Sequence, residues 1–157
     1  FVYLPGGYPE LYLAALSANR QMLQSIRRYV ESGGKLLAEC GGMMYLCDEI
    51  RDKNGYVYPM AGVLHQSATM ENMKLRLGYR TLLYNETRLK GHEFHYSRLV
   101  EQQNPLPSCA VAYTAKGVET DTPLYHYKNV WAGYTHLYWA DPVGNEWFTK
   151  FVIDGNI

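Results

Sequence analysis

The sequence has 157 residues and a mass of 18.0 kDa, which fits a single domain, since domains cluster near about 100–150 residues. Hydrophobic residues make up 47% of it, which excludes a wholly disordered chain. Fifteen Lys and Arg balance fifteen Asp and Glu, and no apolar run reaches the ~20 residues of a membrane span. We therefore expect neither nucleic acid nor a membrane as a partner.

The cysteines and the first residues bear on where the chain belongs. Three Cys, an odd number, occur without a Cys-x-x-Cys pair, which disfavours a disulfide framework or a Cys-rich zinc site and favours a reducing compartment such as the cytoplasm. The chain opens at Phe1 rather than Met, directly in an apolar stretch with no charged segment before it. This is no signal peptide, and we expect a piece cut from a longer chain, N-terminally incomplete.

The first third of the sequence predicts the order strand, helix, strand, helix. A strand over 1–4 ends at Pro5-Gly6-Gly7, and Pro9 suits the first turn of a helix. The apolar side of that helix is expected to carry Leu11, Leu13 and Leu16. A second helix, which ends at residues 32–34, is expected to carry Leu23, Ile26 and Val30 on its apolar side.

The next strand, 35–38, turns through Cys40-Gly41-Gly42 into a helix over 43–50. The remainder predicts a turn at 52–55, a loop at 104–108, a final helix from Asp141-Pro142, and strands over 74–84, 91–100, 109–114, 124–127 and 130–137. Together these elements predict an α/β domain in which a parallel sheet is extended by antiparallel strands.

The strongest local feature is the junction at Cys40, where a strand runs into a cysteine, two glycines and a helix. Such an elbow lifts the side chain out of the sheet and sets it beside backbone N–H groups and a helix N-terminus, which favour the reactive thiolate. The two glycines imply that something approaches the backbone closely. Cys40 is therefore the candidate nucleophile, whereas Cys47 and Cys109 are interpreted as structural.

A nucleophilic cysteine needs a base, and the sequence offers five histidines. His136 lies late in the predicted strand 130–137, and the carboxyl ends of strands in open α/β sheets gather at the edge where the elbow opens. This makes His136 the candidate base, against the alternative of a hydrogen-bonded core histidine.

The stretch 91–97 (GHEFHYS) is dense in polar groups. In a strand His92 and His95 point to opposite faces, so they cannot share one metal ion without a bulge, and we predict no metal site. Glu93 and His95 are candidate pocket residues on the face that also holds Ser97. The alternative is an ordinary half-buried strand with satisfied hydrogen bonds.

Four segments together resemble one family: 4–11 (LPGGYPEL), 38–46 (AECGGMMYL), 91–97 (GHEFHYS) and 134–137 (YTHL). They are similar to the C-terminal glutamine amidotransferase domain of cobyrinate a,c-diamide synthases, a corrinoid-type branch of the class I amidotransferases. The resemblance implies a flavodoxin-like, mostly parallel sheet flanked by helices, with added antiparallel strands. It also implies that 1–157 form part of one amidotransferase domain.

The resemblance further implies a role in cobalamin biosynthesis, with L-glutamine as substrate. Cys40 would be the nucleophile, His136 the general base and acid, and the N–H groups of Gly7 and Gly41 the oxyanion hole. Ammonia would pass to a synthetase domain, where ATP and Mg²⁺ activate a corrinoid acceptor. The sequence contains no G-x-x-x-x-G-K-[ST] phosphate loop, so that domain, with its ATP and Mg²⁺, is expected to be absent here.

Three positions depart from the wider class I pattern. Ala38 stands in place of a glycine, Met44 in place of a glutamine, and Tyr138 in place of the acid of the catalytic triad. The group that orients His136 is therefore open among Glu39, Glu93, Asp141 and a residue of another domain.

Four alternatives to a cobyrinate enzyme also stay open. The acceptor could be hydrogenobyrinate or nickel sirohydrochlorin. The chain could instead be a stand-alone elbow-cysteine hydrolase, or a non-catalytic interaction domain that kept the scaffold.

Overall fold

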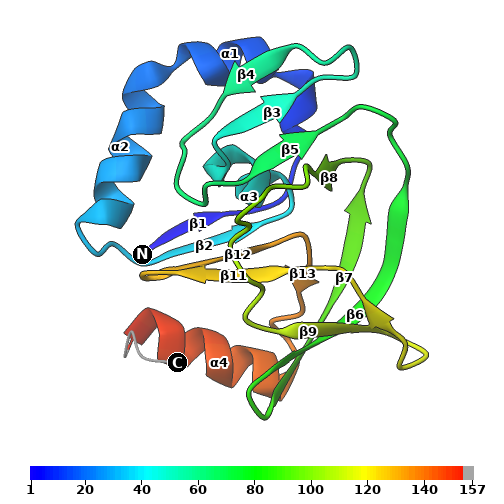
Figure 1. The fold of residues 1–157 in the computed structure, drawn as a ribbon. Helices are drawn as coiled ribbons and strands as arrows, with labels where there is room; N and C mark the ends of the chain where they lie inside the picture. The colour runs from blue at the N-terminus through cyan, green and yellow to red at the C-terminus, as the bar shows by residue number, and fades with distance from the viewer. Residues whose placement is uncertain (154–157) are drawn as a thin grey trace.

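The computed structural model describes residues 1–153 and contains a central sheet, two further sheets and a set of short helices (Figure 1). The helices are α1 (Leu13–Ala18), α2 (Arg20–Glu31), α3 (Gly41–Leu46) and α4 (Pro142–Ile153), with a 3-10 turn at Pro9–Leu11. None of the helices in this range has the length and apolar character needed to cross a membrane.

The central sheet has the order β1-β2-β12-β11. Its strands are β1 (Val2–Leu4), β2 (Leu36–Glu39), β12 (Val130–Gly133) and β11 (Leu124–Tyr127). The first three run parallel and β11 is antiparallel to β12. The mixed sheet predicted from the sequence is thus confirmed.

The second sheet is antiparallel throughout and has the order β10-β9-β6-β7-β13. Its strands are β6 (Arg76–Tyr84), β7 (Thr87–His95), β9 (Val111–Thr114), β10 (Glu119–Thr120) and β13 (His136–Leu137). The third sheet, β4-β3-β5-β8, joins β3 (Glu49–Arg51), β4 (Val57–Pro59), β5 (Ser67–Thr69) and β8 (Arg98–Leu99).

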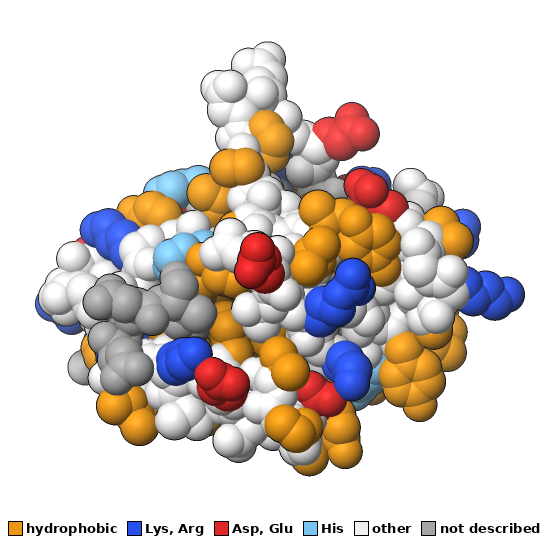
Figure 2. Space-filling view, turned by 90° about the horizontal axis from the view of Figure 1, so that it is seen from below, with side chains coloured by type: hydrophobic (Ala, Val, Ile, Leu, Met, Phe, Trp, Pro, Cys, Tyr) orange, Lys and Arg blue, Asp and Glu red, His pale blue; other side chains and the backbone are white. Residues whose placement is uncertain are grey.

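Two hydrophobic cores lie on opposite faces of the central sheet. Because successive side chains of a strand point to opposite faces, Leu36 and Ala38 of β2 join the core under α1, α2 and α3, while Leu37 joins the core over α4. The second core is rich in aromatic rings, among them Trp131 and Trp147. Figure 1 shows α4 on the opposite side of the central sheet from α1, α2 and α3, next to β9. Figure 2 views the molecule from that side and shows hydrophobic side chains in separate patches among charged ones.

Several predicted elements are confirmed and several are wrong. The strands at 74–84 and 124–127 and the last helix are confirmed, as is the end of α2, where Gly33 has a φ of 91°. The helix over 43–50 is wrong in its second half, because Glu49–Arg51 pairs with β4 and β5. Leu11, expected on an apolar helix face, is 71% exposed.

Two predicted strands are each split in the structure. Residues 91–100 divide between β7 and β8, and residues 130–137 divide between β12 and β13. In both cases the two pieces pair in different sheets. The second break carries His136 from the central sheet to the edge of β7, opposite His92.

Candidate active site

Cys40 occupies a strained elbow between β2 and α3. Its φ of 49° and ψ of −109° lie where residues with a Cβ atom are rarely found, and such strain persists only when the surroundings enforce it. The Cys40 N–H donates to the Gly133 carbonyl at 2.8 Å, and its carbonyl accepts from the Met44 N–H at 3.0 Å. The nucleophile candidate is thus held by β12 on one side and by α3 on the other.

The close approach predicted from the two glycines is confirmed. A Cβ atom on Gly42 would lie 2.2 Å from the Leu4 carbonyl oxygen, and one on Gly41 would lie 2.6 Å from the Gly7 carbonyl oxygen. The approaching group is therefore the end of β1 with the loop that follows it, packed against the N-terminus of α3. Any larger residue at either position would push this loop away.

His136 lies beside this elbow and is fixed between two neighbours. A Cβ atom on Gly6 would lie 2.0 Å from its Cε1 atom, so glycine is required there to leave room for the ring. On its other side the ring stacks on His92, with centroids 5.1 Å apart. The loop after β1 and the strand β7 together define the position of the imidazole.

Cys40, His136 and Glu39 form a connected group. The His136 ring interacts with the Cys40 side chain, and its Nδ1 atom lies 3.6 Å from Glu39 Oε2. The contact with Cys40, followed by that with Glu39, outweighs burial and raises the pKa of His136 to about 9. The geometry therefore favours an imidazolium beside the sulfur at neutral pH.

Glu39 is 3% exposed and is held from two further directions. The Leu137 N–H donates to Oε1 at 3.1 Å, and the Tyr3 hydroxyl donates to Oε2 at 2.7 Å. Burial, followed by this bond to Glu39, raises the pKa of Tyr3 to about 12, so the hydroxyl stays protonated and keeps donating. The carboxylate is thus aimed at the imidazole.

The other two acids considered for this position are engaged elsewhere. Asp141 accepts from Lys90 at 2.8 Å. Glu93 lies fully buried, with Oε2 at 2.9 Å from Arg80 Nη2, an ion pair without hydrogen-bond alignment. Of the three acids named from the sequence, only Glu39 lies against His136.

The backbone N–H groups of Gly7 and Gly41 flank the elbow. Within residues 1–153 neither of them donates a hydrogen bond. Free N–H groups next to a helix N-terminus can stabilise an oxyanion. The Cys40 thiol itself donates to the Phe94 carbonyl at 3.8 Å.

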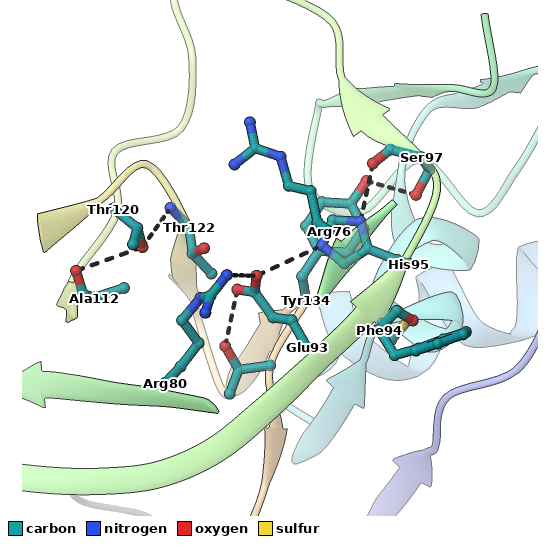
Figure 3. A network of polar contacts seen from close by, with 12 residues as sticks. Arg76, Arg80, Glu93, Phe94, His95, Ser97, Ala112, Thr120, Thr122 and Tyr134 are labelled. Atoms are coloured by element: carbon teal, nitrogen blue, oxygen red, sulfur yellow. Dashed lines mark hydrogen bonds and ion pairs between the residues drawn. The ribbon is translucent and has the colours of Figure 1, made fainter. Parts of the chain in front are cut away.

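The polar face of β7 lies behind this site (Figure 3). There, Glu93 and His95 point away from Phe94 and toward Arg80 and Tyr134, respectively. The His95 ring stacks on Tyr134 at 3.7 Å, and Ser97 donates to the Tyr134 hydroxyl at 3.0 Å. The predicted alternation along the strand is confirmed, with His92 exposed and His95 buried.

Two cavities flank these residues. His95 lines a polar cavity of about 540 Å³ together with Arg76, Arg98, Thr122 and Tyr134, whereas Glu93 is not in its wall. An apolar cavity of about 370 Å³ lies beside the elbow and is lined in part by Gly7, Gly41, Tyr8 and Tyr12. The candidate pocket residues thus differ: His95 faces a cavity and Glu93 supports the strand.

The other two cysteines differ from Cys40 in setting. Cys47 is fully buried and donates to the Met43 carbonyl, and burial raises the pKa of its thiol well above the ordinary value. Burial likewise raises the pKa of Cys109 to about 11. Neither thiol has a histidine as a recorded contact among the described residues.

Sequence reasoning missed Tyr3 and Arg80. Tyr3 belongs to β1, which runs parallel to β2 with Tyr3 opposite Leu37, so its ring reaches the acid two residues on. A polar tip on an otherwise apolar strand was the available signal. Arg80 lies mid-strand in β6, opposite Gly91, and only the strand register places it at Glu93.

The sequence is similar to a known family and to several curated proteins. A family model described as the CobB/CobQ-like glutamine amidotransferase domain matches residues 1–143. A hydrogenobyrinate a,c-diamide synthase of Stutzerimonas stutzeri is 38% identical over 143 residues, covering 90% of this chain and 33% of that protein. A cobyrinate a,c-diamide synthase of Fusobacterium nucleatum is 38% identical over 145 residues, covering 87% of this chain and 31% of that protein.

The chain therefore spans about a third of the length of the curated relatives it matches. Among solved structures, a crystal structure of a glutamine amidotransferase superposes with a TM-score of 0.60, covering 95% of this chain and 77% of that one at 20% identity. At that identity the match supports the fold, which is the amidotransferase-like α/β fold expected from the sequence.

Proposed function

Because this chain belongs to the family of CobB/CobQ-like glutamine amidotransferase domains, we propose that it hydrolyses the side-chain amide of glutamine and releases ammonia. The observation that carries the proposal is the elbow cysteine at positive φ, with the His136 ring interacting with it and lying 3.6 Å from the neighbouring Glu39 carboxylate. That combination supplies an activated sulfur nucleophile and its proton carrier.

The first half of the reaction forms a thioester. With the Cys40 proton already held on His136, the sulfur attacks the amide carbon of glutamine, so that a carbon–sulfur bond forms and the carbonyl oxygen becomes an oxyanion. The N–H groups of Gly7 and Gly41 would hold that oxygen, and one such donor is typically worth ~2.7–4 kcal/mol. His136 then protonates the departing nitrogen, and ammonia leaves as the carbon–nitrogen bond breaks.

The second half regenerates the enzyme. His136 takes a proton from water, whose oxygen attacks the thioester carbon, and the carbon–sulfur bond breaks to give glutamate and the Cys40 thiolate. His136 thus acts first as an acid and then as a base. A pKa raised to about 9 suits the acid role, since the imidazolium is then populated before ammonia departs.

Glu39 takes the part of the orienting acid in this proposal. It replaces the acid that Tyr138 does not supply, and it comes from the residue before the nucleophile rather than from the one two positions after the histidine. Its distance of 3.6 Å from His136 Nδ1 suits a group that sets the ring orientation and balances the imidazolium charge.

The whole protein's reaction is proposed from its relatives. We infer that the ammonia serves the amidation of corrinoid carboxylates in cobalamin biosynthesis, since the relatives are named for cobyrinate and hydrogenobyrinate diamide synthesis. ATP and Mg²⁺ would bind to the part of the protein outside this chain, because the 157 residues contain no phosphate-binding loop of the usual sequence.

A glutamine-mimicking diazoketone tests the proposed function. The purified chain is treated with the reagent, with and without excess glutamine, and the modified peptide is identified by mass spectrometry. We expect a single label on Cys40 that glutamine prevents, with Cys47 and Cys109 as internal controls on the same chain. Labelling of Cys40 that glutamine does not prevent would instead favour an elbow-cysteine hydrolase. An unreactive Cys40 in folded protein would favour a non-catalytic domain.

A further inference from the structure

The outer surface of β6 and β7 is apolar although it faces solvent. We define the β6–β7 face by Leu75, Leu77, Tyr79, Phe94 and Tyr96, whose exposed fractions are 43%, 62%, 75%, 37% and 39%. The register places Leu77 opposite Phe94 and Tyr79 opposite His92, so these side chains share one side of the sheet. Phe94 and Tyr96 also contact each other edge to face at 6.0 Å.

The opposite side of the same strands is already occupied by the molecule itself. Glu93 and His95 are buried, the Arg80 side chain paired with Glu93 is only 10% exposed, and Figure 3 shows Phe94 on the other side of β7 from them. An antiparallel sheet with one solvated face ordinarily carries polar side chains on it. An aromatic and aliphatic outer face instead marks a surface that a partner covers.

The β6–β7 face is continuous with the candidate active site. Tyr79 pairs across the strands with His92, and His92 stacks on His136. The carbonyl of Phe94 accepts the hydrogen bond of the Cys40 thiol. A partner seated on this face would therefore lie within one residue layer of the sulfur and the imidazole.

Resting on the proposed glutamine hydrolysis, we propose that the β6–β7 face is the docking surface for the domain that consumes the ammonia. Ammonia released into water is protonated and loses its nucleophilic lone pair. The acceptor domain must therefore cover the surface next to the candidate active site and exclude water from the released ammonia. About two thirds of the length of the matched relatives lies outside this chain, which is ample for such a domain. A second copy of this chain is the alternative occupant, and the test separates the two.

The experiment uses the complete protein, with the ammonia-consuming part present. Leu77→Ser and Tyr79→Ser are combined in one variant, and Leu11→Ser with Tyr56→Ser forms a control of equal exposure, since those residues are 71% and 69% exposed and lie outside the face. Three rates are compared: glutamate release, amide formation from glutamine, and amide formation from ammonium salt.

We expect glutamate release to stay within about twofold, because exposed substitutions seldom change stability much. Amide formed per glutamate released should fall by about fivefold or more, because central aromatic residues carry most of an interface's binding energy. Amide formation from ammonium salt should be unchanged, as should all three rates of the control variant.

Three results would overturn the proposal. One is an unchanged ratio of amide to glutamate, and another is an equal fall in the control. The third is loss of glutamate release in the face variant alone, which would make the face part of the glutamine site. A photo-crosslinker at position 79 gives an independent readout, and capture of a second copy of this chain would replace the proposed partner. Absence of glutamate release in the unmodified protein would instead refute the proposed function itself.

Discussion

At the scale of single residues, Glu39 is the side chain that we propose to orient His136. A buried carboxylate is costly unless it is paired and hydrogen-bonded, and this one is matched by the Tyr3 hydroxyl, the Leu137 N–H and the ring of His136. The Tyr3 hydroxyl and the Leu137 N–H fix the carboxylate, and the fixed carboxylate in turn orients the His136 ring. The arrangement therefore positions the imidazole relative to Cys40.

Glu39→Gln should weaken glutamine hydrolysis and change its pH dependence. The neutral amide no longer balances the imidazolium, so the pKa of His136, now about 9, should fall toward its ordinary value. We expect kcat to decrease about 10- to 100-fold, part of what general acid–base catalysis contributes. The alkaline limb of the pH profile of kcat/KM should move to lower pH. Steady-state glutamate release from pH 6 to about 10 measures both, a range that brackets the ordinary and raised pKa of histidine.

Tyr3→Phe provides the matched control, since it removes one hydrogen bond to Glu39 and leaves the charge in place. Its alkaline limb should stay close to that of the unmodified protein. If Glu39→Gln lowered kcat without moving the limb, Glu39 would have only a structural role. The raised pKa of His136 also sets how the free energy of unfolding depends on pH. Protonated His136 stabilises the fold fully below about pH 6.5, and this contribution disappears as the pH rises through about 9.

At the scale of elements, much of the fold could be predicted, because the central strands and α2 carry strong periodic patterns. β2 is apolar from Leu36 to Ala38 and buried along its length, and Leu23 and Val30 mark the buried side of α2. The elbow was equally visible, since Cys40-Gly41-Gly42 follows the strand directly. These features depend on local sequence alone.

The remaining elements depend on pairing partners that local sequence does not reveal. Residues 130–137 alternate as one strand would, yet Gly133 pairs with Glu39 whereas His136 pairs with His92 in another sheet. Strands of two or three residues, such as β8 and β3, exist because a neighbour supplies their hydrogen bonds. For the same reason the sequence could name Cys40 and His136 as candidates, whereas finding which of three acids lies beside His136 required the strand register.

Arg80→Met should destabilise the junction of β6 and β7. Burial alone would raise the pKa of Glu93, but His95, Thr122 and the Arg80 charge hold it below its ordinary value. Removing one partner of a buried pair costs about 3–5 kcal/mol, because the other charge is left uncompensated. Since a depressed carboxylate pKa stabilises the fold above its unfolded value and loses this as pH falls, acid unfolding should shift to higher pH. Tryptophan fluorescence during acid titration measures the midpoint.

Arg76→Met is the matched control on the same strand. Its partner Asp121 is 70% exposed at the side chain, and exposed ion pairs contribute only about 0–1 kcal/mol. Its acid midpoint should therefore stay near that of the unmodified protein. Equal midpoints for the two arginine variants would refute the assignment of the buried pair as a support of the strand junction.

At the scale of the whole molecule, the central sheet separates the core that contains Cys40 from the aromatic core over α4. The core between the sheet and the first three helices contains Cys40, Met43 and Met44. The core over α4 contains Trp131, Trp147 and Phe151, with Phe1 packed edge to face on Phe151 at 5.7 Å. Lys35 adds two hydrogen bonds to carbonyls at the end of α4. None of the residues proposed for glutamine hydrolysis lies in the second core.

Truncation of one buried side chain in each core should therefore give different outcomes. Trp147→Ala should lower the free energy of unfolding by about 3–5 kcal/mol, and lower Tm by about 10 °C, with glutamate release unchanged well below the new Tm. Leu46→Ala should cost about 2–5 kcal/mol and also reduce glutamate release, because Leu46 ends α3, whose first turn forms the elbow. Calorimetry and steady-state rates on the two variants give the comparison. Loss of glutamate release in folded Trp147→Ala would show that the sheet transmits strain between the cores and that the separation is wrong.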